Sequence, residues 1–136
     1  MPESATHQFL VQQLVQWVSI NCLDSKNSVL LVDEPARTAI DKPPNLSGYT
    51  PDVYWKSLEG NRVIVGEAKS AHDVESRHSR RQYESFLLHL SRVESGTLLI
   101  AVPWHVVNQA KSLVRAIQRG SGFSNVETVF LDQLPG

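Results

Sequence analysis

Hydrophobic and polar residues recur along the chain with two periods, one typical of helices and one typical of strands. Apolar residues repeat at i, i+4, i+7 and i+8 from Leu10, which predicts a first helix from about residue 6 to residue 20. The stretch after residue 73 and the stretch from about 105 to 119 show the same helical period. Apolar or alternating runs predict strands at about 28–33, 52–57, 62–69, 96–103 and 126–132.

The ends of these elements also have sequence signals. Asp73 is a plausible N-cap, so we expect the second helix to begin near Asp73 or Val74. Gly120 is a plausible C-terminal stop for the third helix. Residues 34–47 contain three prolines and no clear period, which predicts a loop. The predicted core stripe of the second helix consists of Tyr83, Phe86, Leu87 and Leu90.

The stretch from 49 to 70 predicts a β-hairpin that brings three charged side chains together. A turn centred on Glu59 and Gly60 would pair Asp52 with Glu67 across the two strands. A turn moved by one residue would instead pair Asp52 with Lys69. In either register all three side chains lie on one face, because side chains on a strand alternate with a period of two.

Two facing carboxylates repel each other unless a positive charge lies between them. Mg²⁺ suits such a place, since it is commonly held by one or two carboxylates together with phosphate oxygens. The neighbouring ammonium of Lys69 is then suited to stabilise charge or to position a water. The alternative is a solvated hairpin face with a Glu–Lys ion pair.

Pro51-Asp52 followed by Glu67-Ala68-Lys69 resembles the signature of the PD-(D/E)XK nucleases, a superfamily that includes restriction endonucleases, junction resolvases and RecB-like nucleases. The resemblance spans nearly the whole chain. It implies an α/β fold, with a mixed central sheet flanked by helices in a restriction endonuclease-like αβββαβ core. It also implies Mg²⁺ or Mn²⁺ bound by Asp52, Glu67 and the Ala68 carbonyl, with Lys69 orienting the attacking water.

The chain departs from the superfamily pattern on its first helix, which has no acidic residue where the superfamily often places a metal-binding Glu. The substitutes open to the chain are His7, Gln8, Gln12 and Glu3.

Gln82 with Phe86 resembles the Gln-x-x-x-Tyr element of RecB-like nucleases, with Phe in place of Tyr. The resemblance therefore implies that Gln82 holds substrate or a water in the active site, while a plain surface glutamine is the alternative.

Composition and charge limit the partners. A length of 136 residues indicates one domain, 1–136, and a net charge of −1 argues against a protein that coats DNA. DNA contacts would therefore depend on local basic clusters, which otherwise are solvated helix faces. The candidates are Arg77, Arg80 and Arg81 on the second helix and, on the third, Lys111 and Arg115 in a basic line that continues to Arg119.

The chain has no apolar run of the ~20 residues that a transmembrane helix needs, and its beginning does not resemble a secretory signal. A single cysteine, Cys22, excludes an intramolecular disulfide. We therefore expect a cytoplasmic protein.

Together these features predict a Mg²⁺-dependent DNA endonuclease. We expect it to be structure-selective, or the nuclease subunit of a phage, defence or repair system, and to act as a homodimer or within a larger nucleic-acid-processing complex. The alternative is a catalytically inactive nuclease fold that binds DNA or another protein.

Overall fold

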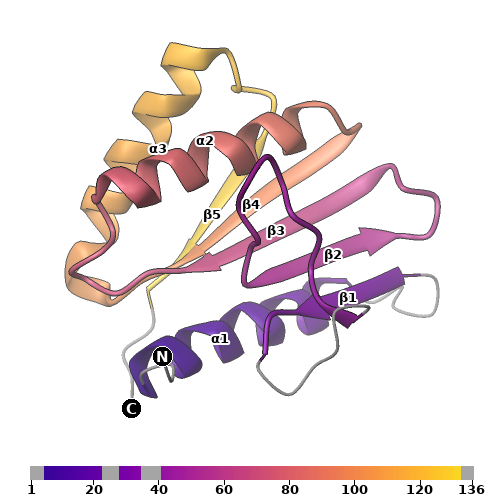
Figure 1. The fold of residues 1–136 in the computed structure, drawn as a ribbon, viewed down its shortest axis with the longest axis horizontal. Helices are drawn as coiled ribbons and strands as arrows, with labels where there is room; N and C mark the ends of the chain where they lie inside the picture. Colours follow the sequence, from indigo (N-terminus) through magenta and orange to yellow (C-terminus); the bar gives the residue numbers. More distant parts are fainter. Residues whose placement is uncertain (1–4, 23–27, 35–40, 133–136) are drawn as a thin grey trace.

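A five-stranded mixed sheet forms the centre of the protein and separates one helix from two others (Figure 1). The computed structural model describes residues 5–22, 28–34 and 41–132. The strands lie side by side in sequence order, with β1, β2 and β3 antiparallel to their neighbours and β3, β4 and β5 parallel. Their bounds are β1 Ser28–Val32, β2 Val53–Ser57, β3 Arg62–Ala68, β4 Ser95–Ala101 and β5 Glu127–Leu131.

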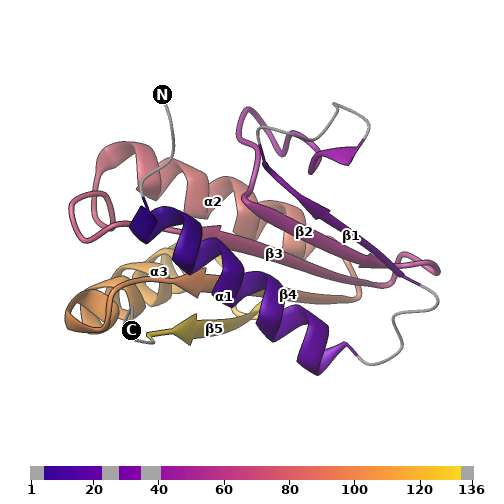
Figure 2. The ribbon, with the colours of Figure 1, turned by 90° about the horizontal axis from the view of Figure 1, so that it is seen from below.

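The helices cover both faces of this sheet. Helix α1 (Ala5–Asn21) crosses one face, whereas α2 (Arg77–Ser91) and α3 (Val107–Ser121) lie on the other, as Figure 2 shows from below. A short 3₁₀ helix, η3 (Trp104–Val106), leads from β4 into α3. The predicted α/β class with a mixed, helix-flanked sheet is confirmed. Within the described ranges no helix is long and apolar enough to cross a membrane.

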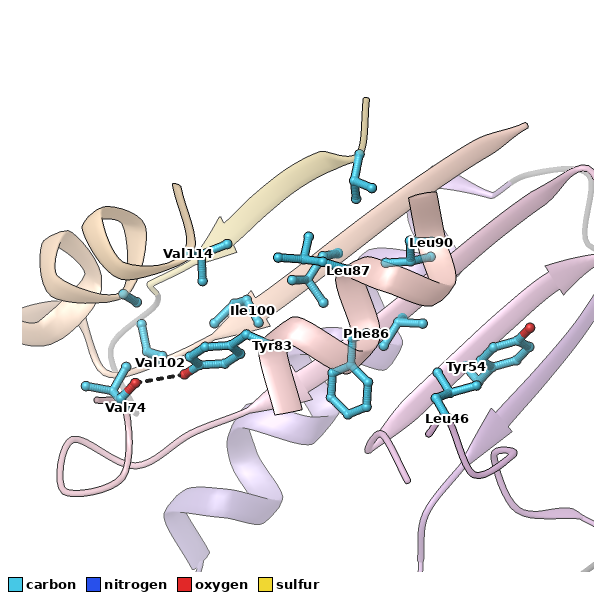
Figure 3. Packing of buried hydrophobic residues seen from close by; sticks show 14 of the residues in the cluster. Leu46, Tyr54, Val74, Tyr83, Phe86, Leu87, Leu90, Ile100, Val102 and Val114 are labelled. Atoms are coloured by element: carbon cyan, nitrogen blue, oxygen red, sulfur yellow. Dashed lines mark hydrogen bonds between the residues drawn. The ribbon is translucent and has the colours of Figure 1, made fainter. Parts of the chain in front are cut away.

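The larger part of the core lies between the sheet and α2. The predicted stripe on α2 is confirmed, because Tyr83, Phe86, Leu87 and Leu90 are all fully buried (Figure 3). The Tyr83 hydroxyl donates a hydrogen bond to the Val74 carbonyl at 2.9 Å. This bond gives the one polar atom of the stripe a partner, as burial of a hydroxyl requires.

The smaller part of the core lies between the sheet and α1, and a glycine sets the approach of that helix. A Cβ atom added to Gly66 in β3 would lie 3.2 Å from the Val53 Cβ and 3.4 Å from a Leu14 methyl. The absence of a side chain at Gly66 therefore lets Leu14 of α1 pack directly against β3, the strand that carries Glu67.

The hairpin adopts the first of the two registers. Trp55 lies opposite Ile64 and Val53 opposite Gly66, so the same register brings Asp52 opposite Glu67. Gly60 in the turn has a φ of 76°, a left-handed conformation that glycine adopts without strain. The position of the turn thus sets Glu67, and not Lys69, opposite Asp52.

The second helix begins later than the sequence predicts. Its first residue is Arg77, and the N-cap is Ser76, whose side chain accepts a hydrogen bond from the Ser79 N–H. Asp73 instead accepts a hydrogen bond from the Ser70 hydroxyl within a preceding turn. Both Asp and Ser are good N-caps, and here the turn engages the first of them.

The third helix ends later than predicted. It continues through Gly120 to Ser121, and the residue that ends it is Gly122, with a φ of 73°. The left-handed conformation of a glycine just after the helix is the usual means of termination. Gly120 is therefore an interior helical residue.

Candidate active site

Four polar side chains converge at the end of the sheet where β2 begins and β3 finishes. Asp52 precedes β2, Glu67 lies near the end of β3, and Lys69 follows that strand. Gln82 reaches the same place from the second turn of α2. All four are nearly buried, with exposed fractions of 9%, 3%, 8% and 8% respectively. Charged residues are seldom buried to this extent without partners, so their contacts define the site.

The two carboxylates are held by reciprocal hydrogen bonds across the strands. The Asp52 N–H donates to Glu67 Oε1 at 3.1 Å, and the Ala68 N–H donates to Asp52 Oδ2 at 2.9 Å. Each side chain is therefore anchored to the backbone of the opposite strand. Such bonds fix the orientation of a carboxylate more firmly than contact between two flexible side chains would.

Lys69 connects the carboxylate pair to α2. Its Nζ lies 3.2 Å from Glu67 Oε2 and donates a hydrogen bond to Gln82 Oε1. The backbone at this point is held as well, because the Lys69 N–H donates to the Ala101 carbonyl at 3.0 Å. The ammonium thus occupies a defined position between the acidic pair and the amide.

The electrostatics of the two acids differ. Burial and the nearby negative charge of Asp52 raise the pKa of Glu67 well above its usual range, and the Lys69 ammonium opposes this shift only in part. Burial also acts to raise the pKa of Asp52, but hydrogen bonds from His7 and the Ala68 N–H outweigh it and hold that pKa below its usual range. Asp52 therefore carries the charge more readily than Glu67.

His7 is the residue of α1 that reaches this pair. Its Nε2 lies 3.4 Å from Asp52 Oδ1. Of the other candidates on or before this helix, Gln8 and Gln12 are exposed and Glu3 lies outside the described residues. Of these candidates, His7 is therefore the one seen to contact the pair, and it contacts a carboxylate in place of supplying one.

The donor set suits a hard divalent cation. Two buried carboxylates face each other, and burial followed by the negative charge of Asp52 raises the pKa of Glu67; a cation between the two would offset the repulsion. Each carboxylate oxygen has a protein partner, but an oxygen with two lone pairs can accept a second contact. In the described part of the chain no group of three or more His, Cys, Asp and Glu side chains is arranged to hold a metal. Backbone, water or phosphate oxygens would therefore complete the coordination, as Mg²⁺ commonly requires.

The predicted basic residues lie outside this buried cluster. Arg77, Arg80 and Arg81 are exposed in the first turns of α2, the helix that also carries Gln82. Lys111 and Arg115 are on α3, half-buried and exposed respectively. Within the described residues, none of these five side chains forms an ion pair with Asp52 or Glu67. Their positive charge therefore remains available to an external anion.

No protein-family model matches the chain, and no curated protein or solved structure is found to be similar to it.

Proposed function

We propose that the protein is a divalent-metal-dependent endonuclease that hydrolyses phosphodiester bonds of DNA. The observation that carries this proposal is the convergence of Asp52, Glu67 and Lys69, almost without solvent exposure, at one end of the sheet. The order of the elements, αβββαβ followed by a further helix and strand, is the order that the PD-(D/E)XK resemblance implies. That agreement supports the proposal.

Asp52 and Glu67 are the residues that would hold Mg²⁺ or Mn²⁺, with the Ala68 carbonyl as a further ligand by resemblance. When bound, the cation supplies Lewis acidity toward phosphoryl oxygens and lowers the pKa of water. A carboxyl must lose its proton to become a ligand, and the raised pKa of Glu67 makes that step less favourable. Asp52, whose pKa is lowered, is ready to bind without that step.

Lys69 would orient the attacking water and stabilise negative charge that develops on the phosphoryl group. Attack by water at phosphorus forms one P–O bond, and the bond to the leaving oxygen breaks in line with it. The resemblance implies a 5′-phosphate product, with the proton going to the 3′-oxygen. Gln82 holds the Lys69 ammonium, so its role is to position that group.

DNA is the partner that this chemistry implies. The exposed arginines at the start of α2 are suited to phosphate contacts that position the duplex or strand, because they precede Gln82 on the same helix. Cleavage of both strands of a duplex usually takes two such sites, which favours a homodimer or a larger complex.

The test is cleavage of labelled single-stranded, duplex, flap and four-way-junction DNA with Mg²⁺, with Mn²⁺ and with a chelator. We expect metal-dependent cutting that Lys69→Ala and Asp52→Asn reduce by at least about a hundredfold, the scale of a lost electrostatic contact in a transition state. Glu84→Gln, a replacement of an exposed residue on α2, is the control and should cut like the wild type.

Circular dichroism of each variant separates loss of chemistry from loss of folding. Absence of cutting on every substrate by a folded wild-type protein, with both metals tried, would overturn the endonuclease. One observation favours an alternative in that case: all four carboxylate oxygens already have protein partners. A nuclease fold that binds DNA or a protein without cutting would then be the better explanation, and metal binding unaffected by Asp52→Asn would agree with it.

A further inference from the structure

A second concave site lies away from the carboxylate cluster, between the first two strands, the C-terminal half of α2 and the segment 42–47. Its volume is about 480 Å³, within the range of roughly 300–1,000 Å³ typical of small-molecule pockets. The apolar part of its lining comes from Leu31, Leu46, Tyr54 and Leu88. Figure 3 shows Leu46 against the ring of Tyr54 at the margin of the core.

The charged residues of the lining are all cationic. Lys42, Lys56 and Arg92 contribute three positive charges, and none of the described residues that line the cavity is acidic. Lys42 is partly neutralised, since its Nζ lies 3.8 Å from Asp33 Oδ1. Lys56 and Arg92 are exposed, and neither has an ion-pair partner within the described ranges. Two uncompensated cations at the rim of a pocket create a positive potential that attracts anions.

A neutral polar pair completes the wall. The Tyr54 hydroxyl lies 3.2 Å from His89 Nε2, and their rings are tilted at a centroid separation of 5.9 Å. Burial, together with the positive charges of Lys56 and Arg92, lowers the pKa of His89. The imidazole is therefore kept neutral beside the two cations, as a hydrogen-bonding group in place of a third competing charge.

From this arrangement we propose that the cavity binds a nucleotide, with its phosphate on Lys56 and Arg92 and its base against the apolar floor. An inorganic anion would use only the cationic rim, and an apolar ligand only the floor. A phosphorylated nucleoside uses both, and its base supplies hydrogen-bonding groups for the Tyr54–His89 pair. Arginine and lysine together are the usual recognition groups for phosphate.

The site is distinct from the carboxylate cluster but lies on the same face of β2. Asp52, Tyr54 and Lys56 occupy every second position along the chain, so their side chains share one side of the strand. Lys56 therefore lies ~13 Å along the sheet from Asp52. The rings of Tyr49 and His78, whose centroids are 5.4 Å apart, connect the segment before β2 to α2. A stacked DNA strand covers this length in about four nucleotides. The nucleotide could therefore belong to a DNA strand or be free, and the experiment distinguishes these two sources.

The experiment is a heteronuclear NMR titration of the full chain, with a chelator present so that metal-dependent cleavage plays no part. The probes are deoxyadenosine monophosphate, inorganic phosphate, deoxyadenosine and a short single-stranded oligonucleotide. We expect saturable shifts of the Tyr54, Lys56, His89 and Arg92 amides with the mononucleotide, at least about tenfold tighter than with phosphate or nucleoside alone.

Lys56→Ala combined with Arg92→Ala should weaken mononucleotide binding about tenfold or more, whereas Arg119→Ala on α3 should leave it unchanged. Both replaced side chains are exposed, so the folded spectrum should persist. Tighter binding of the oligonucleotide, lost in the double variant, would identify a DNA strand as the source. Equal affinity would identify a free nucleotide.

Shifts confined to α3 or to the first turn of α2, no saturable shifts, or phosphate binding as tight as nucleotide binding would each overturn the inference. These results are independent of the endonuclease. A protein that cuts DNA but shows no nucleotide at this cavity refutes only the second site, and a protein that binds here without cutting refutes only the first.

Discussion

The backbone N–H of Asp52 donates to Glu67 Oε1 at 3.1 Å, so the two acids face each other across β2 and β3 at a separation that both burial and charge oppose. Hydrogen bonds from His7 and the Ala68 N–H outweigh the effect of burial at Asp52, whereas the Lys69 ammonium beside Glu67 offsets burial and the Asp52 charge only in part. A folded protein that retains such a pair holds unfavourable electrostatic energy at this point. Functional sites commonly carry unfavourable energy of this kind.

The first prediction concerns the dependence of stability on pH. The pKa of Glu67 is raised in the folded protein above its ordinary value of 4.5, so the folded state holds this proton more strongly than the unfolded chain. Its contribution to stability is therefore complete below about pH 4.5 and is lost as the pH rises through the folded pKa. The pKa of Asp52 is lowered from its ordinary value of 3.8, so its contribution to stability is lost in the opposite direction, as the pH falls below that value.

The measurement is the free energy of unfolding from pH 4.5 to pH 8 by urea denaturation without divalent cations, for the wild type and for Glu67→Gln. The wild-type value relative to the variant should fall as the pH rises. Comparison of the two proteins cancels the contributions of groups such as His89, whose pKa is lowered. A difference that stays constant across this range would contradict the prediction.

The second prediction concerns metal binding. Mg²⁺ or Mn²⁺ that binds only the folded protein should stabilise it by about 1.4 kcal/mol at tenfold excess over the dissociation constant, which corresponds to a rise of a few degrees in Tm. Asp52→Asn should abolish the rise, because it removes one of the two carboxylates. Glu59→Gln, an exposed residue in the hairpin turn, is the charge-matched control. An equal rise in Asp52→Asn would place the cation elsewhere.

Much of the fold follows from local sequence patterns. Strand alternation alone predicts that Asp52, Glu67 and Lys69 lie on one face, because side chains on a strand repeat every two residues. Both plausible registers of the hairpin preserve that face. The structure selects between the registers through the turn at Gly60. The helix ends are harder to predict from the sequence. Asp73 and Ser76 are both good N-caps, and only the turn that precedes α2 decides between them.

The rest depends on tertiary arrangement. His7 was one of four candidates, and only the rotation of α1 relative to the sheet brings its ring to Asp52. Lys56 and Arg92 lie 36 positions apart in the sequence (92 minus 56), in segments with no shared motif. The cavity that they line lies between the first two strands, residues 42–47 and the C-terminal half of α2, and no local pattern describes that arrangement. Residues that meet only through packing leave no periodic signal.

The third prediction isolates Gln82. Gln82→Leu keeps the volume of the side chain but removes the acceptor for the Lys69 ammonium, so the lysine loses one of its two partners. We expect the single-turnover rate of DNA cleavage to fall about tenfold with substrate affinity unchanged, which corresponds to ~1.4 kcal/mol at the transition state. Glu84→Gln, exposed on the same helix, should cleave at the wild-type rate. A change confined to affinity would instead make Gln82 a substrate contact.

The fourth prediction compares the two basic clusters. If the exposed arginines at the start of α2 contact phosphates, replacement of Arg77, Arg80 and Arg81 by Ala should weaken DNA binding and reduce the salt dependence of log K by up to about three. Lys111→Ala with Arg115→Ala on α3 should reduce it by up to about two if α3 also contacts DNA. Fluorescence anisotropy at several salt concentrations measures both slopes. An unchanged slope removes that cluster from the interface, with the other cluster as the internal comparison.

The last prediction contrasts two glycines, one in a crowded strand and one on an open helix. A Cβ atom at Gly96 in β4 would lie 2.6 Å from the Leu90 carbonyl oxygen and 2.9 Å from the Leu90 Cβ, so Gly96→Ala must displace α2 from the strand. We expect it to destabilise the protein by about 1–3 kcal/mol, the usual cost of overpacking.

A Cβ at Gly120 would meet nothing within 4 Å, and Gly120 lies inside α3 with no positive φ. Gly120→Ala should therefore stabilise the protein by about 0.5 kcal/mol, since alanine loses less backbone entropy in a helix. Urea denaturation of both variants measures the opposite signs, and equal effects would show that α2 does not pack against β4 as closely as this geometry requires.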